Sequence, residues 1–256
     1  DHLETHRLQR ETELWRAIEN EEFVLFYQPI RALASGEIVG AEALIRWQHP
    51  EEGLLAPGEF IAVAQDSGMI VPMGAWVKTM ACKQGARWIN NNGRKDFIVS
   101  VNFSARNFRE PDFVERVGST LAHTGLPARN LQIELTERAL LRGMGRLNEL
   151  RAMGVKIAVD DLGTGYASLE YLSRLEIDSF KIDRTFVGNI ANHERNRAVV
   201  EAVLLMGERM GLRVIAEGIE TEEELEILRA LGCRYGQGFL LGRPMPASDF
   251  DKLLGG

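Results

Sequence analysis

The stretch Gly40-Ala-Glu42-Ala-Leu44-Ile-Arg46 places an anion and a cation on a predicted strand that is otherwise apolar. In an extended segment, residues two apart point the same way, so Glu42, Leu44 and Arg46 share one face. A buried strand seldom carries Glu and Arg unless the two residues pair or take part in chemistry. The fold prediction therefore depends on whether other strands show the same pattern.

Six further segments begin with apolar residues and carry an ionisable or amide residue near their ends. They are residues 97–102, 131–137, 155–161, 179–183, 212–217 and 235–239. One face of these segments is apolar throughout, as in Val99, Val101 and Phe103. We expect that face to pack against helices.

Helix-length segments separate the predicted strands. They include residues 72–91, 111–123, 143–153, 193–210 and 222–231. Gly154, Gly211 and Gly232 follow three of them, in the left-handed backbone position that commonly ends an α-helix.

Alternating strands and helices predict parallel strands with crossover helices. At 256 residues, the chain fits a closed α/β barrel of the TIM (β/α)8 type, with functional groups at the C-terminal strand ends. An open doubly wound sheet is the alternative, but it would not bring all the polar ends to one point.

The composition indicates one main domain. Hydrophobic residues make up 45% of the chain and there are only 8 prolines, so a full-sized core is expected. No linker or low-complexity run follows Glu19. We therefore expect residues 1–20 to form a connector helix, the tail of a linker from a longer protein, and residues 21–256 to form the functional domain.

Net charge and cysteine usage narrow the partners and the compartment. The net charge of −7 argues against a nucleic acid polymer as partner but is compatible with a small phosphorylated ligand held by metal. Cys82 and Cys233 have no metal-ligand spacing, and we expect reduced thiols. The longest apolar run, residues 198–206, contains Glu201 and is too short to span a membrane. A cytoplasmic location is expected, either for a separate protein or for the cytoplasmic portion of a larger, membrane-anchored one.

Six carboxylates are predicted to meet at one mouth of the barrel, with Arg46 and Lys181 as the obvious compensating cations. The carboxylates are Glu42, Glu134, Glu137, Asp160, Asp161 and Glu217. Crowded carboxylates cannot all stay ionised unaided, and divalent cations relieve the repulsion. Together with the amide of Asn102, they form an oxygen ligand set suited to Mg²⁺ or Mn²⁺. The five histidines are expected to lie away from the strand ends, which argues against a His-rich zinc site.

Adjacent Asp160 and Asp161 would point to opposite faces of a straight strand. The following Leu162-Gly-Thr-Gly165 supplies a sharp turn that lets both carboxylates share a metal centre. An Asp-rich turn or helix N-cap is an equal alternative for this pair alone. A dinucleotide-binding loop is disfavoured because the third glycine is missing. For Glu134 and Lys181, a plain salt bridge between strands is the alternative.

Eight motifs in order resemble those of the EAL-domain cyclic di-GMP phosphodiesterases, over about residues 23–250. They are Tyr27-Gln28-Pro29-Ile30, Glu42-Ala43-Leu44-Ile45-Arg46, Asn102-Phe103-Ser104, Glu134-Leu135-Thr136-Glu137, Asp160-Asp161-Leu162-Gly163-Thr164-Gly165-Tyr166, Lys181-Ile182-Asp183, Glu217-Gly218-Ile219-Glu220 and Gln237-Gly238-Phe239. The resemblance implies a modified (β/α)8 barrel whose first strand runs antiparallel to the rest. It also implies hydrolysis of cyclic di-GMP to linear pGpG with two Mg²⁺ or Mn²⁺ ions, while Ca²⁺ would inhibit.

The resemblance also implies a role for each residue. The metal ligands would be Glu42, Asn102, Glu134, Asp160 and Asp161, with Asp160 bridging the two ions. The catalytic groups would be Lys181 and Glu217, which orient and deprotonate the attacking water, and Glu137, which holds the loop of residues 161–168. The substrate contacts would be Gln28, Leu44, Arg46, Asp183 and Gln237.

Two departures from the family pattern keep a second function open. Leu162 stands where the family usually has Phe, and Ala167 where it usually has Ser. Some relatives have lost metal or loop residues and bind cyclic di-GMP without cleaving it, so a catalytically weak receptor is the alternative function. The family further implies a homodimer and fusion to sensor or GGDEF-type domains in the full-length protein.

Overall fold

The computed structural model describes residues 2–140, 143–160 and 176–255. Within them, eight strands close into a barrel in the order β1-β2-β4-β5-β6-β7-β8-β9, and β1 pairs with both β2 and β9. The barrel strands are β1 (Phe23–Ala32), β2 (Ile38–His49), β4 (Ile98–Phe103), β5 (Leu131–Thr136), β6 (Lys156–Asp160), β7 (Ser179–Ile182), β8 (Arg213–Ala216) and β9 (Tyr235–Gly236). The barrel prediction is confirmed, and the open sheet is wrong.

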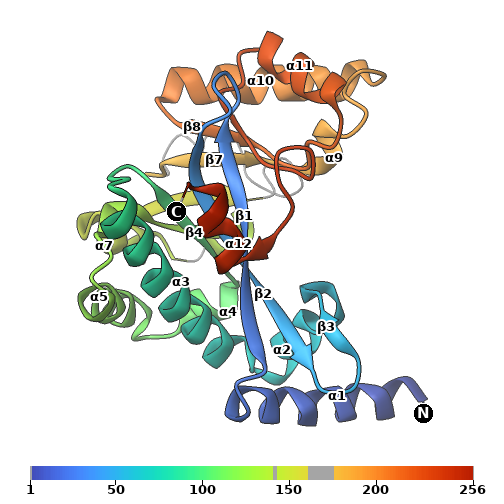
Figure 1. The fold of residues 1–256 in the computed structure, drawn as a ribbon, viewed down its shortest axis with the longest axis vertical. Coiled ribbons are helices and arrows are strands. Elements are labelled where there is room, and N and C mark those ends of the chain that lie inside the picture. Colours follow the sequence, from blue (N-terminus) through green and yellow to red (C-terminus); the bar gives the residue numbers. More distant parts are fainter. Residues whose placement is uncertain (1, 141–142, 161–175, 256) are drawn as a thin grey trace.

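The first strand runs against the others. β1 is antiparallel to β2 and β9, whereas the other barrel strands, β2 and β4 to β9, run parallel to one another. The antiparallel pair β1 and β2 is long, and Figure 1 shows it as the blue strands that run most of the height of the molecule. The prediction of a single reversed strand, the first, is confirmed.

Helices surround the barrel close to the ranges predicted. The longer ones are α3 (Ile70–Asn92), α5 (Phe113–Thr124), α7 (Met144–Ala152), α10 (Glu194–Met210) and α11 (Glu222–Ala230). The shorter ones are α2 (Ile61–Ser67), α4 (Ala105–Arg109), α6 (Glu137–Leu140), α9 (Arg184–Val187) and α12 (Ala247–Leu253), with 3-10 turns η1 (Pro57–Glu59) and η2 (Ala128–Asn130). Gly154, Gly211 and Gly232 have φ values of 96°, 69° and 85°, as their places after helices require.

The two faces of the barrel strands differ in polarity. The apolar residues of β4 to β8 belong to two buried clusters that pack against the surrounding helices, as predicted. The alternate residues face the barrel interior, and many of them are polar, including Glu42, Ser100, Gln132 and Lys181. This barrel therefore lacks the wholly aliphatic filling that is common in (β/α)8 barrels.

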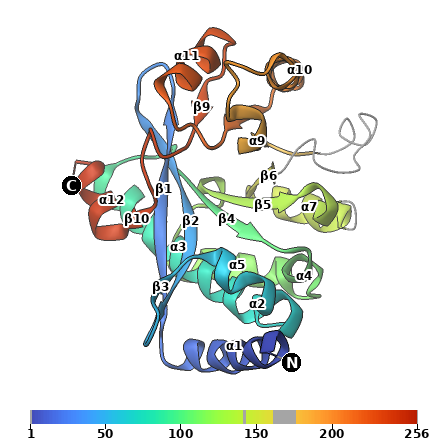
Figure 2. The ribbon, with the colours of Figure 1, turned by 90° about the vertical axis from the view of Figure 1, so that its right-hand side faces the viewer.

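A layer formed by α1 (His2–Glu19), α2 and β3 (Gly53–Leu55) covers the part of β2 that extends past the barrel. Figures 1 and 2 both show α1 at the end of the molecule opposite α10 and α11. Leu14 and Ala17 of α1 are fully buried, and Arg10 is 6% exposed. The helix is thus packed on the domain; its role as the end of a connector stays a prediction.

The C-terminal segment closes the other side of β1. β10 (Met245–Pro246) pairs antiparallel with β1, and α12 follows it. Phe250 of α12 is fully buried, with its ring centroid 4.7 Å from that of Trp88 and 6.3 Å from that of Tyr27. The last helix therefore fastens β1 to α3.

Two further findings concern the cysteines and the membrane. Cys82 and Cys233 are free and buried, and burial raises the pKa of their thiols to about 12 and about 11. Among the described residues, no helix has the length and apolar character needed to cross a membrane.

Candidate active site

A fully buried lysine lies among three carboxylates at the C-terminal strand ends. Lys181 on β7 places its Nζ 2.6 Å from Oε2 of Glu134 on β5 and 3.2 Å from Oε2 of Glu42 on β2. The same Nζ is 2.6 Å from Oε1 of Glu217, which directly follows β8. Four of the residues predicted from separate strands therefore meet at one point.

Two amides fix the orientation of Glu42. Asn102 on β4 donates its Nδ2–H to Glu42 Oε1 at 2.6 Å. Gln237, which follows β9, donates its Nε2–H to Glu42 Oε2 at 2.6 Å and to Glu217 Oε1 at 3.4 Å. Gln237 was predicted as a substrate contact, and the structure shows that it also contacts two carboxylates.

Burial raises the pKa of two of the three carboxylates that surround Lys181. Burial raises the pKa of Glu134 to about 8, and the charge of Glu42 adds to the rise. Burial also raises the pKa of Glu217 well above its usual value, against the effect of Lys181. Burial by itself would raise the pKa of Glu42, but Lys181 and hydrogen bonds from Gln237 and Asn102 outweigh it and lower the pKa.

Lys181 itself stays charged. Burial lowers the pKa of a lysine, but the charges of Glu134, Glu217 and Glu42 outweigh that effect and raise the pKa of Lys181 well above its usual value. A charged ammonium at the centre of the mouth is therefore a fixed feature of the site.

The donor set fits divalent cations of the hard class. Glu134 Oε1 is buried, and in the described part of the chain it has no hydrogen-bond partner. A buried carboxylate oxygen without a partner is costly unless a cation or water completes it. Carboxylate oxygens together with the Asn102 amide suit Mg²⁺ or Mn²⁺.

The remaining predicted residues lie around this centre or outside the described part. Asp160 ends β6 and contributes to the electrostatics of Lys181, Glu134 and Glu217. Glu137 is 5% exposed and begins α6, so it lies at a helix start and not on the strand. Asp161 lies outside the described residues, as do Leu162 and Ala167.

The predicted substrate contacts lie on β1, β2 and the start of α9. Gln28 is in register with Glu42 and donates its Nε2–H to the Gly242 carbonyl at 3.1 Å. Arg46 is half-buried, and its guanidinium carbon lies 5.4 Å from the ring centroid of Phe26. Leu44 is half-buried. Asp183 caps α9 by accepting a hydrogen bond from the Thr185 backbone at 2.8 Å.

A second acidic group lies away from this centre. One oxygen each of Glu13 and Glu52 and one nitrogen of His49 lie within 4.8 Å of one another. His49 ends β2, so the expectation that every histidine lies away from the strand ends is wrong. Its Nδ1 accepts hydrogen bonds from the backbone of Glu51 and Glu52, and Arg10 pairs with Glu52 at 2.7 Å. We interpret this group as the polar contact that holds α1 on β2.

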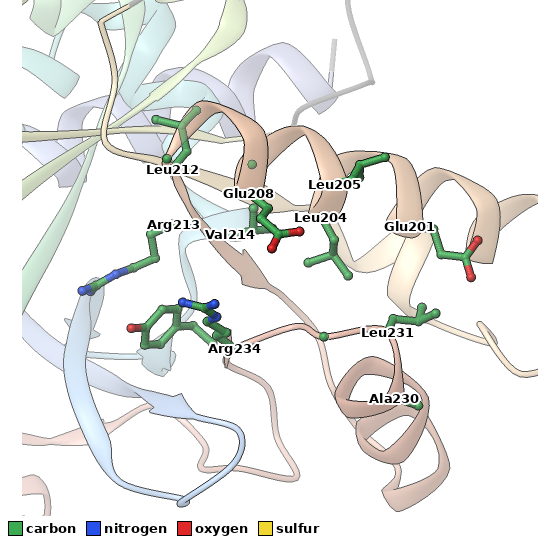
Figure 3. Close-up of a pocket in the computed structure, with 14 residues that line it drawn as sticks. Glu201, Leu204, Leu205, Glu208, Leu212, Arg213, Val214, Ala230, Leu231 and Arg234 are labelled. Carbon is green, nitrogen blue, oxygen red and sulfur yellow. The ribbon is translucent and has the colours of Figure 1, made fainter.

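A large cavity at the other end of the barrel is not the predicted site. It has a volume of about 840 Å³ and lies between α10 and α11, beside the first residues of β8 and β9. Figure 3 shows the residues that line it. Its lining includes Leu204, Glu208, Arg213, Leu231 and Arg234. None of the residues predicted for the site lines this cavity, so the volume of a cavity alone does not identify the active site.

The chain belongs to the EAL domain family, whose model matches residues 11–244. It is 42% identical over 245 residues to the bifunctional diguanylate cyclase/cyclic di-GMP phosphodiesterase MucR of Pseudomonas aeruginosa, covering 94% of this chain and 36% of MucR. It is 40% identical over 254 residues to the cyclic di-GMP phosphodiesterase NbdA of the same organism, covering 98% of this chain and 32% of NbdA. The chain thus spans about a third of the length of these relatives.

A solved structure agrees with this membership. The PaMucR phosphodiesterase in complex with c-di-GMP superposes with a TM-score of 0.91 at 41% identity, covering 94% of this chain and 99% of that one. The family resemblance inferred from the eight motifs is confirmed.

Proposed function

We propose that this domain is a metal-dependent phosphodiesterase that hydrolyses cyclic di-GMP to linear pGpG. The observation that carries the proposal is the buried Lys181 ammonium in contact with Glu42, Glu134 and Glu217 at the C-terminal strand ends. The relatives named as cyclic di-GMP phosphodiesterases and the PaMucR complex with c-di-GMP support the choice of substrate.

We assign the metal ligands as the motifs imply. Glu42, Asn102, Glu134 and Asp160 would hold one Mg²⁺ or Mn²⁺ ion, and Asp160 with Asp161 a second. Two such ions supply activation of a water molecule and neutralisation of phosphate charge. The unpartnered Glu134 oxygen supports this assignment, because a buried carboxylate oxygen without a hydrogen-bond partner is costly unless a cation or water completes it.

The side chains of the domain perform the proton and positioning steps. Glu217 accepts the proton of the attacking water, and its half-buried carboxylate is held by Lys181 and Gln237. Lys181 presents a fixed positive charge toward the same point and keeps the three carboxylates from moving apart. Glu137 is assigned to support the loop of residues 161–168.

Substrate binding is assigned to residues of β1 and β2, to the residue before α9 and to the residue after β9. Gln28, Leu44, Arg46, Asp183 and Gln237 would contact the nucleotide, with Arg46 on a phosphate. Arg46 stacks on Phe26, and no ion pair engages its guanidinium among the residues that the structure describes. Its charge is thus available to an anionic ligand.

The wider setting belongs to the same proposal. We propose that the domain works in the cytoplasm, as a homodimer, and within a longer chain that carries sensor or GGDEF-type domains. The bifunctional name of MucR and the coverage of a third of its length support the last point.

The decisive experiment is chromatography of cyclic di-GMP after incubation with the domain. We expect pGpG with Mg²⁺ or Mn²⁺, no product with excess chelator, and inhibition by Ca²⁺, which tolerates looser geometry. If the domain binds cyclic di-GMP but forms no product under any metal condition, the result would favour the alternative function of a cyclic di-GMP receptor. Full activity in excess chelator would contradict the two-metal assignment.

A further inference from the structure

A second polar group lies inside the barrel, below the carboxylates. It consists of Ser100 on β4, Gln132 on β5 and Ser179 on β7, which are 0%, 3% and 1% exposed. Nothing in their sequence context distinguishes them, because uncharged polar residues occur in many strands. Their location in a dry interior means that each must find a hydrogen-bond partner.

The three side chains satisfy one another. Gln132 donates its Nε2–H to Ser100 Oγ at 2.8 Å and accepts a hydrogen bond from Ser179 Oγ at 2.8 Å. The amide has a donor at one end and an acceptor at the other, so Gln132 can bridge both hydroxyls at once. We call Ser100, Gln132 and Ser179 the interior bridge.

The contact between Gln132 and Ser179 in the interior bridge joins two strands that are not neighbours. β6 lies between β5 and β7, and its Ala158 is in register with Glu134 on one side and Ser179 on the other. Ala158 is fully buried, and its side chain is a single methyl group. The small side chain therefore leaves space for Gln132 to reach Ser179 across β6.

Each member of the interior bridge precedes a site residue by two positions. Residues two apart on a strand point the same way, so Asn102, Glu134 and Lys181 lie directly above the interior bridge. The ion pair of Lys181 with Glu134, at 2.6 Å, repeats the connection between β7 and β5 that Ser179 and Gln132 make one layer below. The two contacts therefore connect β5 and β7 at two successive levels of the barrel interior.

We propose that Gln132 is a positioning residue for the metal and water site. By joining β4, β5 and β7 across the interior, it fixes the places of Asn102, Glu134 and Lys181. The proposal rests on the proposed function for the identity of that site. Residues that orient metal ligands typically contribute 10- to 100-fold to metal affinity or activity, which is the size of effect expected here.

Two variants distinguish a role of Gln132 in positioning the site from a role in stabilising the barrel core. Gln132→Leu keeps a similar volume but leaves two buried hydroxyls without partners, so it should lower the unfolding temperature. The triple variant Ser100→Ala/Gln132→Leu/Ser179→Ala removes the hydroxyls as well and should recover most of that loss. Both variants should bind Mn²⁺ about tenfold more weakly than the wild type in calorimetry, and both should turn over more slowly at saturating substrate.

Asn130, the last residue of η2 and the one directly before β5, supplies a matched control. It is fully buried, and its amide donates to the Lys95 and Phe97 carbonyls at 2.8 Å each. Asn130→Ala should lower the unfolding temperature yet bind Mn²⁺ as the wild type does.

Several results would overturn the inference. Wild-type Mn²⁺ affinity in the triple variant would do so, as would an equal loss of affinity in Asn130→Ala. If the wild type binds Mn²⁺ but forms no pGpG, the proposed function fails while the binding comparison still decides on Gln132. A wild type that binds no Mn²⁺ would overturn both.

Discussion

Lys181 shows how a buried charge is kept at a site built from carboxylates. Removing an ammonium from water costs several kcal/mol, and its pairs return that cost only with good geometry. Contacts of 2.6 Å with both Glu134 and Glu217 supply such geometry. Three carboxylates contact this one ammonium. Lys181 and the proposed metal ions would therefore act on the same carboxylates.

The variant Lys181→Met should destabilise the metal-free protein by about 3–5 kcal/mol, because it leaves buried carboxylates without their cation. Saturating Mn²⁺ should recover part of the loss. Lys156→Met is the control on the neighbouring strand, since its side chain is 42% exposed and 3.5 Å from Asp178, and it should cost about 0–1 kcal/mol. Urea unfolding with and without Mn²⁺ checks this, and an equal loss in both conditions would contradict the shared role.

Glu217→Gln keeps the shape of the proposed base and removes its ability to accept a proton. We expect kcat to fall by about 10²- to 10⁴-fold, while the affinity for cyclic di-GMP changes little. The control Glu208→Gln alters an exposed carboxylate beside the cavity between α10 and α11 and should keep wild-type turnover. Near-normal turnover of Glu217→Gln would remove Glu217 from its assigned step.

At the scale of elements, the sequence predicts the strands best where polarity alternates. The apolar faces of β4 to β8 and the charged strand ends follow from period-two patterns, so the barrel and the meeting of Glu42, Glu134, Lys181 and Glu217 could be predicted. The extension of β2 to His49 and the layer of α1 on it could not, because surface pairings leave no periodic signal. The interior bridge was also missed, since Gln132 and Ser179 pair across an intervening strand.

The packing of α1 on β2 depends on the guanidinium of Arg10, which contacts both a carboxylate and an aromatic ring. Arg10 is paired with Glu52 at 2.7 and 3.0 Å, and its guanidinium carbon lies 5.3 Å from the ring centroid of Trp47. Arg10→Met should lower the free energy of unfolding by about 1–2 kcal/mol, because the pair is charged but Glu52 is half exposed. Arg16→Met, on the exposed face of the same helix, serves as the control in urea unfolding. Equal effects of the two substitutions would show that Arg10 does not hold the helix.

At the scale of the whole molecule, α12 fastens β1 of the barrel to the surrounding helix α3. Phe250→Ala should cost about 3–5 kcal/mol, since it opens a cavity beside Trp88 and Tyr27. Turnover measured below the unfolding transition should stay unchanged, because Phe250 lies outside the barrel interior. Leu253→Ala, at a side chain 41% exposed, should change stability by less than about 0.5 kcal/mol. A large loss of turnover in folded Phe250→Ala would contradict this separation.

The reversed direction of β1 has a consequence for how a longer polypeptide would be arranged. Phe23, at the start of β1, is in register with Trp47, near the end of β2, so the chain enters the barrel from the end where the carboxylates lie. A parallel first strand would have entered from the opposite end. The residues that link α1 to β1 therefore lie at the same end of the barrel as the carboxylates, and an upstream domain would be joined to the barrel from that end.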